Sequence, residues 1–150
     1  MQEASSTVIY TQGYQPRLIA RVTDMHIDFY GRNYGFGAVF ERKVATELSE
    51  FMGRIDHDQN AIFTAHQNNE IIGSVSIDSE DLGDRQFHLR WFVVGDSAKG
   101  LGIGRSLMTH AMAFVDQHPD WTTQLWTFRG LDSARHLYER FGFHLSAEKS

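Results

Sequence analysis

The sequence Lys99-Gly100-Leu101-Gly102-Ile103-Gly104-Arg105 decides the fold of this 150-residue chain. It follows a strand-like run at residues 89–94 and leads into an amphipathic segment that extends to residue 117. Alternate glycines let the backbone approach a ligand closely. The first N–H groups of a helix have no intrahelical partner, and the helix dipole favours negative charge beside them. The stretch therefore predicts an anion site at the start of a helix, with a pyrophosphate as its ligand.

Two common phosphate-binding motifs fit this stretch poorly. A dinucleotide fingerprint reads G-x-G-x-x-G after the first strand of a βαβ unit, whereas the spacing here is G-x-G-x-G, two-thirds of the way along the chain. A Walker loop carries its lysine after the glycines, whereas Lys99 precedes them. The stretch instead resembles the Q/R-x-x-G-x-G/A signature of the GNAT family of acetyltransferases, with Lys99, Gly102 and Gly104 in the signature positions. A dinucleotide-dependent oxidoreductase is a distant alternative.

A second motif strengthens this resemblance. Residues 134–143, ARHLYERFGF, are similar to the A-x-x-L-Y-x-x-x-G-F pattern of the last helix in the family. Asp132 suits the N-cap of that helix, and Gly142 suits the C′ position at its end. The resemblance extends over residues 10–143. Within it, LRWF at residues 89–92 and LWTFRGL at residues 125–131 are similar to the acetyltransferase domains fused to MarR-type DNA-binding regulators.

The periodicity of apolar residues predicts an α+β fold with the element order βααβββαβα. Strands are expected at residues 7–14, 61–66, 71–77, 87–94 and 123–127. Helices are expected at residues 17–30, around the stripe Phe40, Val44, Leu48 and Phe51, and at residues 102–117 and 132–141. Residues 31–37 are expected to break the first helix, and residues 68–70 to form a hairpin turn. The GNAT fold, a mixed central sheet flanked by helices, has this order.

The chain is expected to form a single acetyltransferase domain over residues 1–150, with a short or missing final strand. GNAT folds end in two antiparallel strands after the last helix, but only a few residues, 144–150, follow that helix here. An unpaired strand edge tends to recruit another strand. We therefore expect either a homodimer joined through the C-terminal region or a chain that is shortened relative to its full form.

The composition excludes several classes of protein. No apolar run approaches the ~20 residues of a membrane span and the first residues lack signal-peptide features, so a cytoplasmic protein without a membrane partner is expected. The absence of cysteine excludes disulfides, Cys-ligated metals and a cysteine acyl-enzyme, and no metal is expected. The formal net charge of −5 argues against a nucleic-acid partner.

The resemblance implies acetyl-CoA as the cosubstrate. In GNAT enzymes the pantetheine pairs with the backbone of the fourth strand, where neighbouring strands part, and that place is occupied here by Phe92, Val93 and Val94. A bulge there would expose a main-chain N–H that polarises the thioester carbonyl. The pyrophosphate would be held by the backbone of Lys99, Gly100, Leu101, Gly102, Ile103, Gly104 and Arg105. The implied reaction moves an acetyl group to a primary amine of a small molecule or peptide, by direct attack in a ternary complex.

Tyr138 is the expected proton donor to the departing thiolate, because it occupies the tyrosine position of the last-helix motif. A tyrosine has a reference pKa of about 10, above the thiol value of about 8.5, so it stays protonated at neutral pH. Many GNATs place an asparagine seven residues before this tyrosine, where this chain has Leu131. That difference favours the alternative function, a noncatalytic module that binds acetyl-CoA or CoA and regulates a partner.

The general base has several candidates. Some GNATs carry a glutamate on the fifth strand, but QLWTF at residues 124–128 has no carboxylate. The candidates elsewhere are His88, Asp78 and Glu41, and a chain of water molecules is equally permissible. His88 has the most suitable reference pKa, about 6.5, for proton transfer at neutral pH, so it is the base that we expect.

The acceptor is expected between the first two helices and the later strands. His26 and Tyr30 lie one helical turn apart and could line a pocket. Tyr34 lies in a loop that commonly closes over the acceptor in GNATs, and Glu41, with Asp24 and Asp28, could attract a cationic amine. The expected substrate residues are therefore His26, Tyr30, Tyr34 and Glu41. The alternative is that the aromatic side chains among them seal the core.

Overall fold

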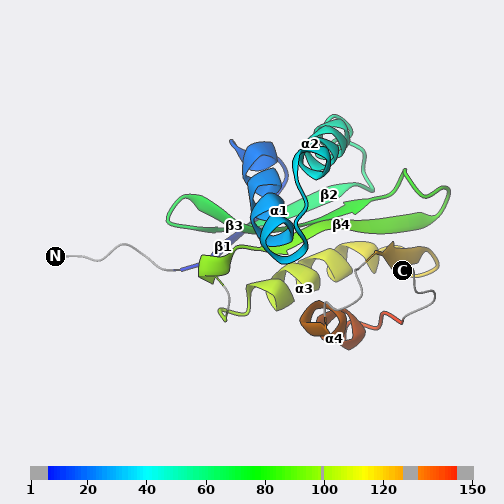
Figure 1. Ribbon diagram of the computed structural model, residues 1–150. Helices are drawn as coiled ribbons and strands as arrows, with labels where there is room; N and C mark the ends of the chain where they lie inside the picture. Colours follow the sequence, from blue (N-terminus) through cyan, green and yellow to red (C-terminus); the bar gives the residue numbers. More distant parts are fainter. Residues whose placement is uncertain (1–6, 99, 127–131, 145–150) are drawn as a thin grey trace.

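The computed structural model describes residues 7–98, 100–126 and 132–144. These residues form a five-stranded sheet flanked by helices (Figure 1). The elements in chain order are β1 (Ile9–Gln12), α1 (Leu18–Tyr34), α2 (Ala38–Met52), β2 (Ala61–Gln67), β3 (Glu70–Asp78), β4 (Gln86–Val94), the short 3-10 helix η1 (Asp96–Ala98), α3 (Ile103–Val115), β5 (Thr122–Leu125) and α4 (Asp132–Arg140). The predicted α+β order is confirmed through α4. The expected short or missing final strand falls on residues that lie mostly outside the described ranges.

Two strands of the sheet part from each other at one edge. Consecutive strands are neighbours, in the order β1-β2-β3-β4-β5, and only β4 and β5 run parallel. β4 and β5 pair along residues 86–89 and 122–125. β4 continues to Val94, whereas β5 ends at Leu125. Among the described residues, the second half of β4 therefore has no strand beside it on that edge.

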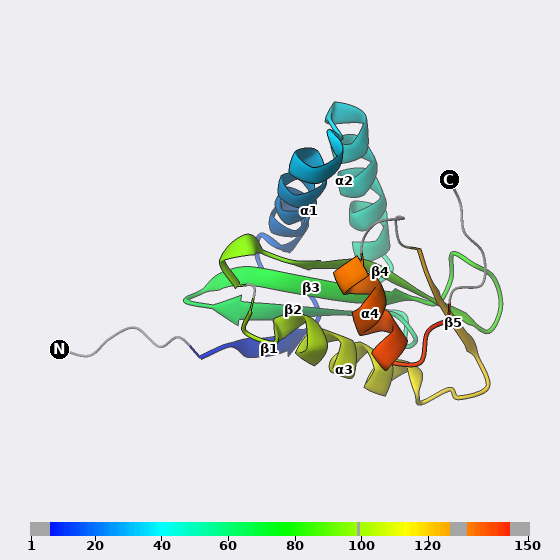
Figure 2. The same ribbon diagram turned by 60° about the horizontal axis from the view of Figure 1, so that its bottom comes forward.

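Helices α1 and α2 cover one face of the sheet, and α3 and α4 cover the other (Figures 1 and 2). Each helix pair buries its own apolar core because side chains alternate across a strand. The core beneath α1 and α2 includes Leu18, Val22, Leu48, Phe51, Ile62, Ile71 and Val93. The core beneath α3 includes Phe63, Val75, Ile77, Phe87, Leu89, Leu107, Met108 and Ala111. Gly73 lets α3 lie close to β3, because a Cβ there would stand 3.0 Å from the Leu107 side chain.

A β-bulge interrupts β4 where it leaves β5. Ser76 pairs with Arg90 and Ser74 with Val93, so Val75 faces both Trp91 and Phe92. Trp91 has the positive φ of 50° that such a bulge uses. The serine hydroxyls hold the distortion, because Ser76 Oγ donates to the Arg90 carbonyl at 2.8 Å and Ser74 Oγ to the Trp91 carbonyl at 2.7 Å.

The bulge shifts the alternation of side chains along β4. Phe87 and Leu89 pack in the core beneath α3, and beyond the bulge Phe92 and Val94 pack against that same core. Val93 instead packs beneath α1 and α2. Regular alternation would have put residues 91 and 93 on the α3 face. The extra residue therefore decides which β4 side chains reach each face.

The first helix is longer than the sequence predicts. α1 continues through Gly31 to Tyr34, and it ends at Gly35, whose φ of 68° is left-handed and whose N–H donates to the Gly31 carbonyl at 3.0 Å. The expected break over residues 31–37 is therefore wrong at its start. A single glycine inside a helix costs only about 1 kcal/mol, which tertiary packing outweighs.

The last helix ends as predicted. Gly142 has a φ of 95°, its N–H donates to the Glu139 carbonyl at 3.0 Å, and the Phe143 N–H donates to the Tyr138 carbonyl at 3.2 Å. These two bonds are a Schellman motif with Gly142 at C′. Asp132, the expected N-cap, is instead the first residue of α4. Within the described ranges, no helix has both the length and the apolar character that crossing a membrane requires.

Candidate active site

The parting of β4 and β5 opens a cavity that passes from one face of the sheet toward the other. Its volume is about 180 Å³. It is lined by His26 and Tyr30 of α1, by His88, Leu89, Arg90, Trp91 and Phe92 of β4, by Leu125 and Trp126 at the end of β5, and by Tyr138 of α4. The cavity thus brings together four of the sequence-predicted catalytic and substrate residues: His26, Tyr30, His88 and Tyr138.

Tyr138 is held by aromatic neighbours. Its ring lies 5.8 Å from the ring of Phe92 and 6.3 Å from the ring of Phe143, centroid to centroid. Burial raises the pKa of the Tyr138 hydroxyl well above its ordinary value, and the nearby Tyr30 adds to the increase. The hydroxyl is therefore protonated at neutral pH and carries a hydrogen that a departing thiolate could accept, but the raised pKa makes it a weaker acid than a free tyrosine.

His88 is held between an acid and an indole ring. Its Nδ1 lies 2.7 Å from Oδ2 of Asp81, in the connection between β3 and β4, and its ring centroid lies 4.7 Å from that of Trp126. Burial lowers the pKa of His88, and the hydrogen bond and charge of Asp81 offset only part of that decrease. The imidazole is therefore mostly neutral at pH 7 and can accept a proton.

His26 is a buried imidazole with a defined tautomer. Its Nδ1 lies 2.8 Å from the carbonyl oxygen of Val22, which can only accept a hydrogen bond, so Nδ1 carries the hydrogen. Burial lowers the pKa of His26, and the bond to Val22 opposes that effect only in part. The ring stacks with Tyr30 at 6.0 Å. His26 therefore presents a neutral ring whose Nε2 is an acceptor.

The glycine-rich turn divides into an open part and a packed part. Gly100 and Gly102 have φ values of 88° and 73°, and a Cβ at either would meet no atom within 4 Å. At Gly104 a Cβ would stand 3.4 Å from Phe92 Cζ and 3.5 Å from Leu137 Cδ2. Gly100 and Gly102 therefore leave the start of α3 open to a ligand, whereas Gly104 lets α3 pack against β4 and α4. Lys99 lies outside the described residues.

Asp78 serves in an ion-pair network and is poorly suited to act as a base. It is fully buried, and its carboxylate accepts hydrogen bonds from Arg54 at 3.0 and 2.9 Å, from the Glu80 N–H at 2.9 Å and from Arg90 at 3.2 Å. Burial favours the neutral acid, but these hydrogen bonds and charges outweigh it and lower the pKa of Asp78. A carboxylate with a lowered pKa and several donors takes up a proton reluctantly.

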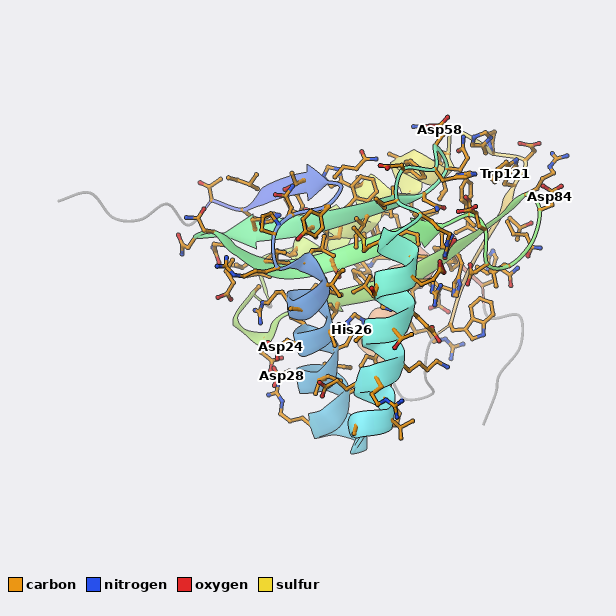
Figure 3. All side chains as sticks on the ribbon, turned by 90° about the horizontal axis from the view of Figure 1, so that it is seen from above. Asp24, His26, Asp28, Asp58, Asp84 and Trp121 are labelled. Carbon is orange, nitrogen blue, oxygen red and sulfur yellow. The ribbon has the colours of Figure 1, made fainter. Side chains whose placement is uncertain are left out.

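The other expected acidic residues lie away from the cavity. Glu41 lines a separate hollow between the outer sides of α1 and α2. Asp24 pairs with Arg21 at 3.0 Å, and Asp28 pairs with Arg32 at 2.8 Å. In Figure 3 both aspartates lie on the margin of α1, whereas His26 lies between α1 and α2. The structure therefore does not bring the expected substrate residue Glu41 to the site, and the side chain of Tyr34 lies outside the description.

Sequence reasoning missed Asp81, Arg90, Trp91 and Trp126. Trp126 is 54% exposed and lines the cavity directly after β5. It belongs to the LWTFRGL segment at residues 125–131, whose similarity to other acetyltransferase domains was the sequence signal that could have indicated it. Trp91 lines the cavity at the bulge, which no local pattern reveals, whereas Arg90 precedes the bulge and follows His88 in the regular alternation of β4. Among the residues described, no three His, Asp or Glu side chains come together as potential metal ligands.

A mixed sheet whose fourth and fifth strands part beside an open glycine turn is the architecture of an acetyltransferase. A family model described as the acetyltransferase (GNAT) family matches residues 19–143, and the chain belongs to that family. A search of curated protein sequences gives no match.

Solved structures share the fold. A predicted acetyltransferase with acetyl-CoA from Clostridium acetobutylicum is 12% identical, with a TM-score of 0.74 over 96% of this chain and 94% of that one. An acetyltransferase of the GNAT family from Staphylococcus aureus is 15% identical, with a TM-score of 0.76 over 92% of this chain and 84% of that one. Glucosamine-6-phosphate N-acetyltransferase from Arabidopsis thaliana is 15% identical, with a TM-score of 0.63 over 96% of each chain. At these identities the similarity shows the fold alone.

Proposed function

We propose that the protein is an N-acetyltransferase that transfers the acetyl group of acetyl-CoA to a primary amine by direct attack in a ternary complex. The observation that carries the proposal is the cavity beside the β4 bulge, which contains one neutral imidazole paired with a carboxylate and one protonated phenol. Acetyl-CoA, when bound, supplies an activated acetyl thioester. Every other step is assigned to groups of this chain.

The backbone of β4 and of the glycine turn would hold the cosubstrate. Phe92, Val93 and Val94 lie beyond the point where β5 leaves β4, so a pantetheine could lie beside them in place of a strand. Gly100 and Gly102 leave open space for a pyrophosphate at the start of α3, where unpaired N–H groups favour an anion. A main-chain N–H at the bulge would polarise the thioester carbonyl.

Two side chains would move the protons. His88 takes a proton from the acceptor ammonium, which frees the lone pair of the amine for attack at the carbonyl carbon. The amine nitrogen attacks, the C–S bond breaks as the new C–N bond becomes an amide, and Tyr138 gives its proton to the departing sulfur. The second proton lost by the nitrogen would return to the Tyr138 oxygen, and His88 would release the first proton to water. His26, Tyr30 and Trp126 line the same cavity and would contact the acceptor, a small molecule or a peptide amine.

The remaining expectations belong to this proposal. We take residues 1–150 as a single domain acting in the cytoplasm, without a metal, a nucleic acid or a membrane as partner, and with a homodimer as the assembly to be tested. The similarity to acetyltransferase domains fused to MarR-type regulators stays a prediction from two short segments.

The test is the release of CoA thiol from acetyl-CoA across a panel of amines and peptides, with product mass as a second readout. Acetylation of at least one amine by the wild-type protein, reduced in the Tyr138→Phe and His88→Gln variants, is the expected result. The second candidate, a noncatalytic module that binds acetyl-CoA, is favoured by Leu131 and by β5, whose residues Thr122–Leu125 include no carboxylate. Tight acetyl-CoA binding without turnover of any amine would select it.

A further inference from the structure

Asp81 meets His88 although it belongs to the connection between β3 and β4 (residues 79–85) rather than to the cavity wall. The connection folds back so that Asp81 Oδ2 lies 2.7 Å from His88 Nδ1. The side chain of His88 is 15% exposed and that of Asp81 28%, so the bond lies at the edge of the cavity and is partly shielded from water. Because His88 is mostly neutral, the contact is a hydrogen bond from the imidazole to the carboxylate rather than an ion pair, and its importance lies in its geometry.

The pairing determines which nitrogen of His88 is available. An ionised carboxylate can only accept hydrogen bonds, so Nδ1 of the neutral imidazole carries the hydrogen and Nε2 carries the lone pair. A histidine that acts as a base must direct this lone pair toward the group from which it takes the proton. His88 lines the cavity and its Nδ1 is taken by Asp81, which leaves Nε2 as the nitrogen for an acceptor.

Arg90 holds Asp81 in turn. Arg90 Nη1 lies 3.3 Å from Asp81 Oδ2 and 3.2 Å from Asp78 Oδ2, and Arg90 Nη2 lies 2.7 Å from Glu47 Oε1 of α2. Its guanidinium also lies 4.0 Å from the Trp91 ring centroid. The Asp81 carboxylate is therefore attached to the sheet and to α2, which restricts its movement relative to His88.

The charged groups around His88 act in opposite directions. Asp81 and Asp78 raise the pKa of His88, whereas burial and the Arg90 guanidinium lower it. The other titratable groups that line the same cavity are His26, Tyr30 and Tyr138. Burial keeps His26 largely neutral at neutral pH and the Tyr138 hydroxyl protonated, so neither adds a charge beside His88 there.

We propose that Asp81 is a positioning residue that holds His88 with Nδ1 protonated and Nε2 available as the base, and that Arg90 keeps Asp81 in place. The inference rests on the proposed function, in which His88 accepts the proton of the acceptor amine. It assigns to the connection between β3 and β4 a part in the reaction.

The test compares Asp81→Asn with Asp84→Asn, which makes the same change in the same connection. Figure 3 shows Asp84 at the outer end of that connection. In Asp81→Asn, kcat at neutral pH is expected to fall by roughly 10²-fold, within the range for general base catalysis, while the KM for acetyl-CoA is unchanged. The low-pH limb of the rate profile should move to lower pH, because a carboxylate that raises the pKa of His88 has been removed. Asp81→Glu should restore part of the rate, and Asp84→Asn should behave as wild type.

A measurement independent of turnover separates this inference from the proposed function. Nitrogen-15 shifts of His88 report the tautomer directly, and the wild-type protein is expected to carry the hydrogen on Nδ1, with a loss of that preference in Asp81→Asn. A wild-type protein that acetylates no amine contradicts the proposed function. The tautomer measurement would still decide whether Asp81 fixes the hydrogen of His88 on Nδ1. An active wild type with an Asp81→Asn variant of equal rate, equal pH limb and equal tautomer would overturn the inference.

Discussion

Replacing Gly102 by alanine separates backbone strain from ligand binding. Gly102 has φ 73° and ψ 16°, and no atom lies within 4 Å of an added Cβ. The substitution therefore creates no clash in the free protein, and its only cost there is the left-handed conformation, about 1–2 kcal/mol. For a domain of this size that cost corresponds to a decrease of about 2–8 °C in Tm.

The ligand-bound protein should show a second effect. At a concentration of 100 times its Kd, a ligand that binds only the folded state adds about 2.7 kcal/mol to the free energy of unfolding. An added methyl group at Gly102 would stand in the space that the pyrophosphate is expected to occupy, so most of this stabilisation should disappear. The assay is thermal unfolding of wild type and variant with and without acetyl-CoA.

Gly35→Ala is the matched control. Gly35 has φ 68° and ψ 21°, also with no atom within 4 Å of a Cβ, and it lies at the end of α1. It carries the same backbone strain without adjoining the start of α3. We expect equal losses of Tm in the two variants, with the acetyl-CoA shift retained only in Gly35→Ala. A Gly102→Ala protein with the full acetyl-CoA shift would show that the phosphate site lies elsewhere.

Three further predictions concern the acid, the pH dependence of stability and the oligomeric state. Tyr138→Phe keeps the ring contacts and removes the proton donor, so kcat should fall by roughly 10²–10⁴-fold with little change in the Kd for CoA. An unchanged rate of the chemical step would show that Tyr138 serves only in packing. Burial lowers the pKa of His26 in the folded state, so the unfolded chain binds a proton first and stability should decrease as pH falls below about 6.5. Urea unfolding across pH 5–8 should show a weaker decrease in His26→Gln, and identical slopes for both proteins would contradict the assignment. Light scattering over a concentration series should detect a homodimer, and hydrogen exchange should show protection of residues 140–150 that depends on protein concentration. A monomer with a well-protected C-terminal region would refute that expectation.

Local patterns in the sequence determined the order of the elements and the form of several junctions. Apolar spacing indicates which residues of α1, α2 and α3 face the sheet, since the 3.6-residue period is a property of the helix itself. Gly142 ends α4 with a positive φ at the predicted C′ position, and Gly102 lies directly before the start of α3, one residue from where the sequence predicts the helix to begin. The two contiguous motifs also predict the anion site and single out Tyr138, which the structure places in the wall of the cavity.

Only the tertiary structure decided which of the candidate residues share a cavity. The bulge at Trp91 and the early end of β5 are relations between strands, and they open the site to His26 and Tyr30 from one face and to Tyr138 from the other. The titration of His88 depends on Asp81 and on burial, and the unsuitability of Asp78 as a base depends on Arg54, which is distant in sequence. Periodicity and motifs involve residues that are close in sequence, so they can be recognised from the sequence alone. Burial and charge pairing exist only once distant segments are packed together.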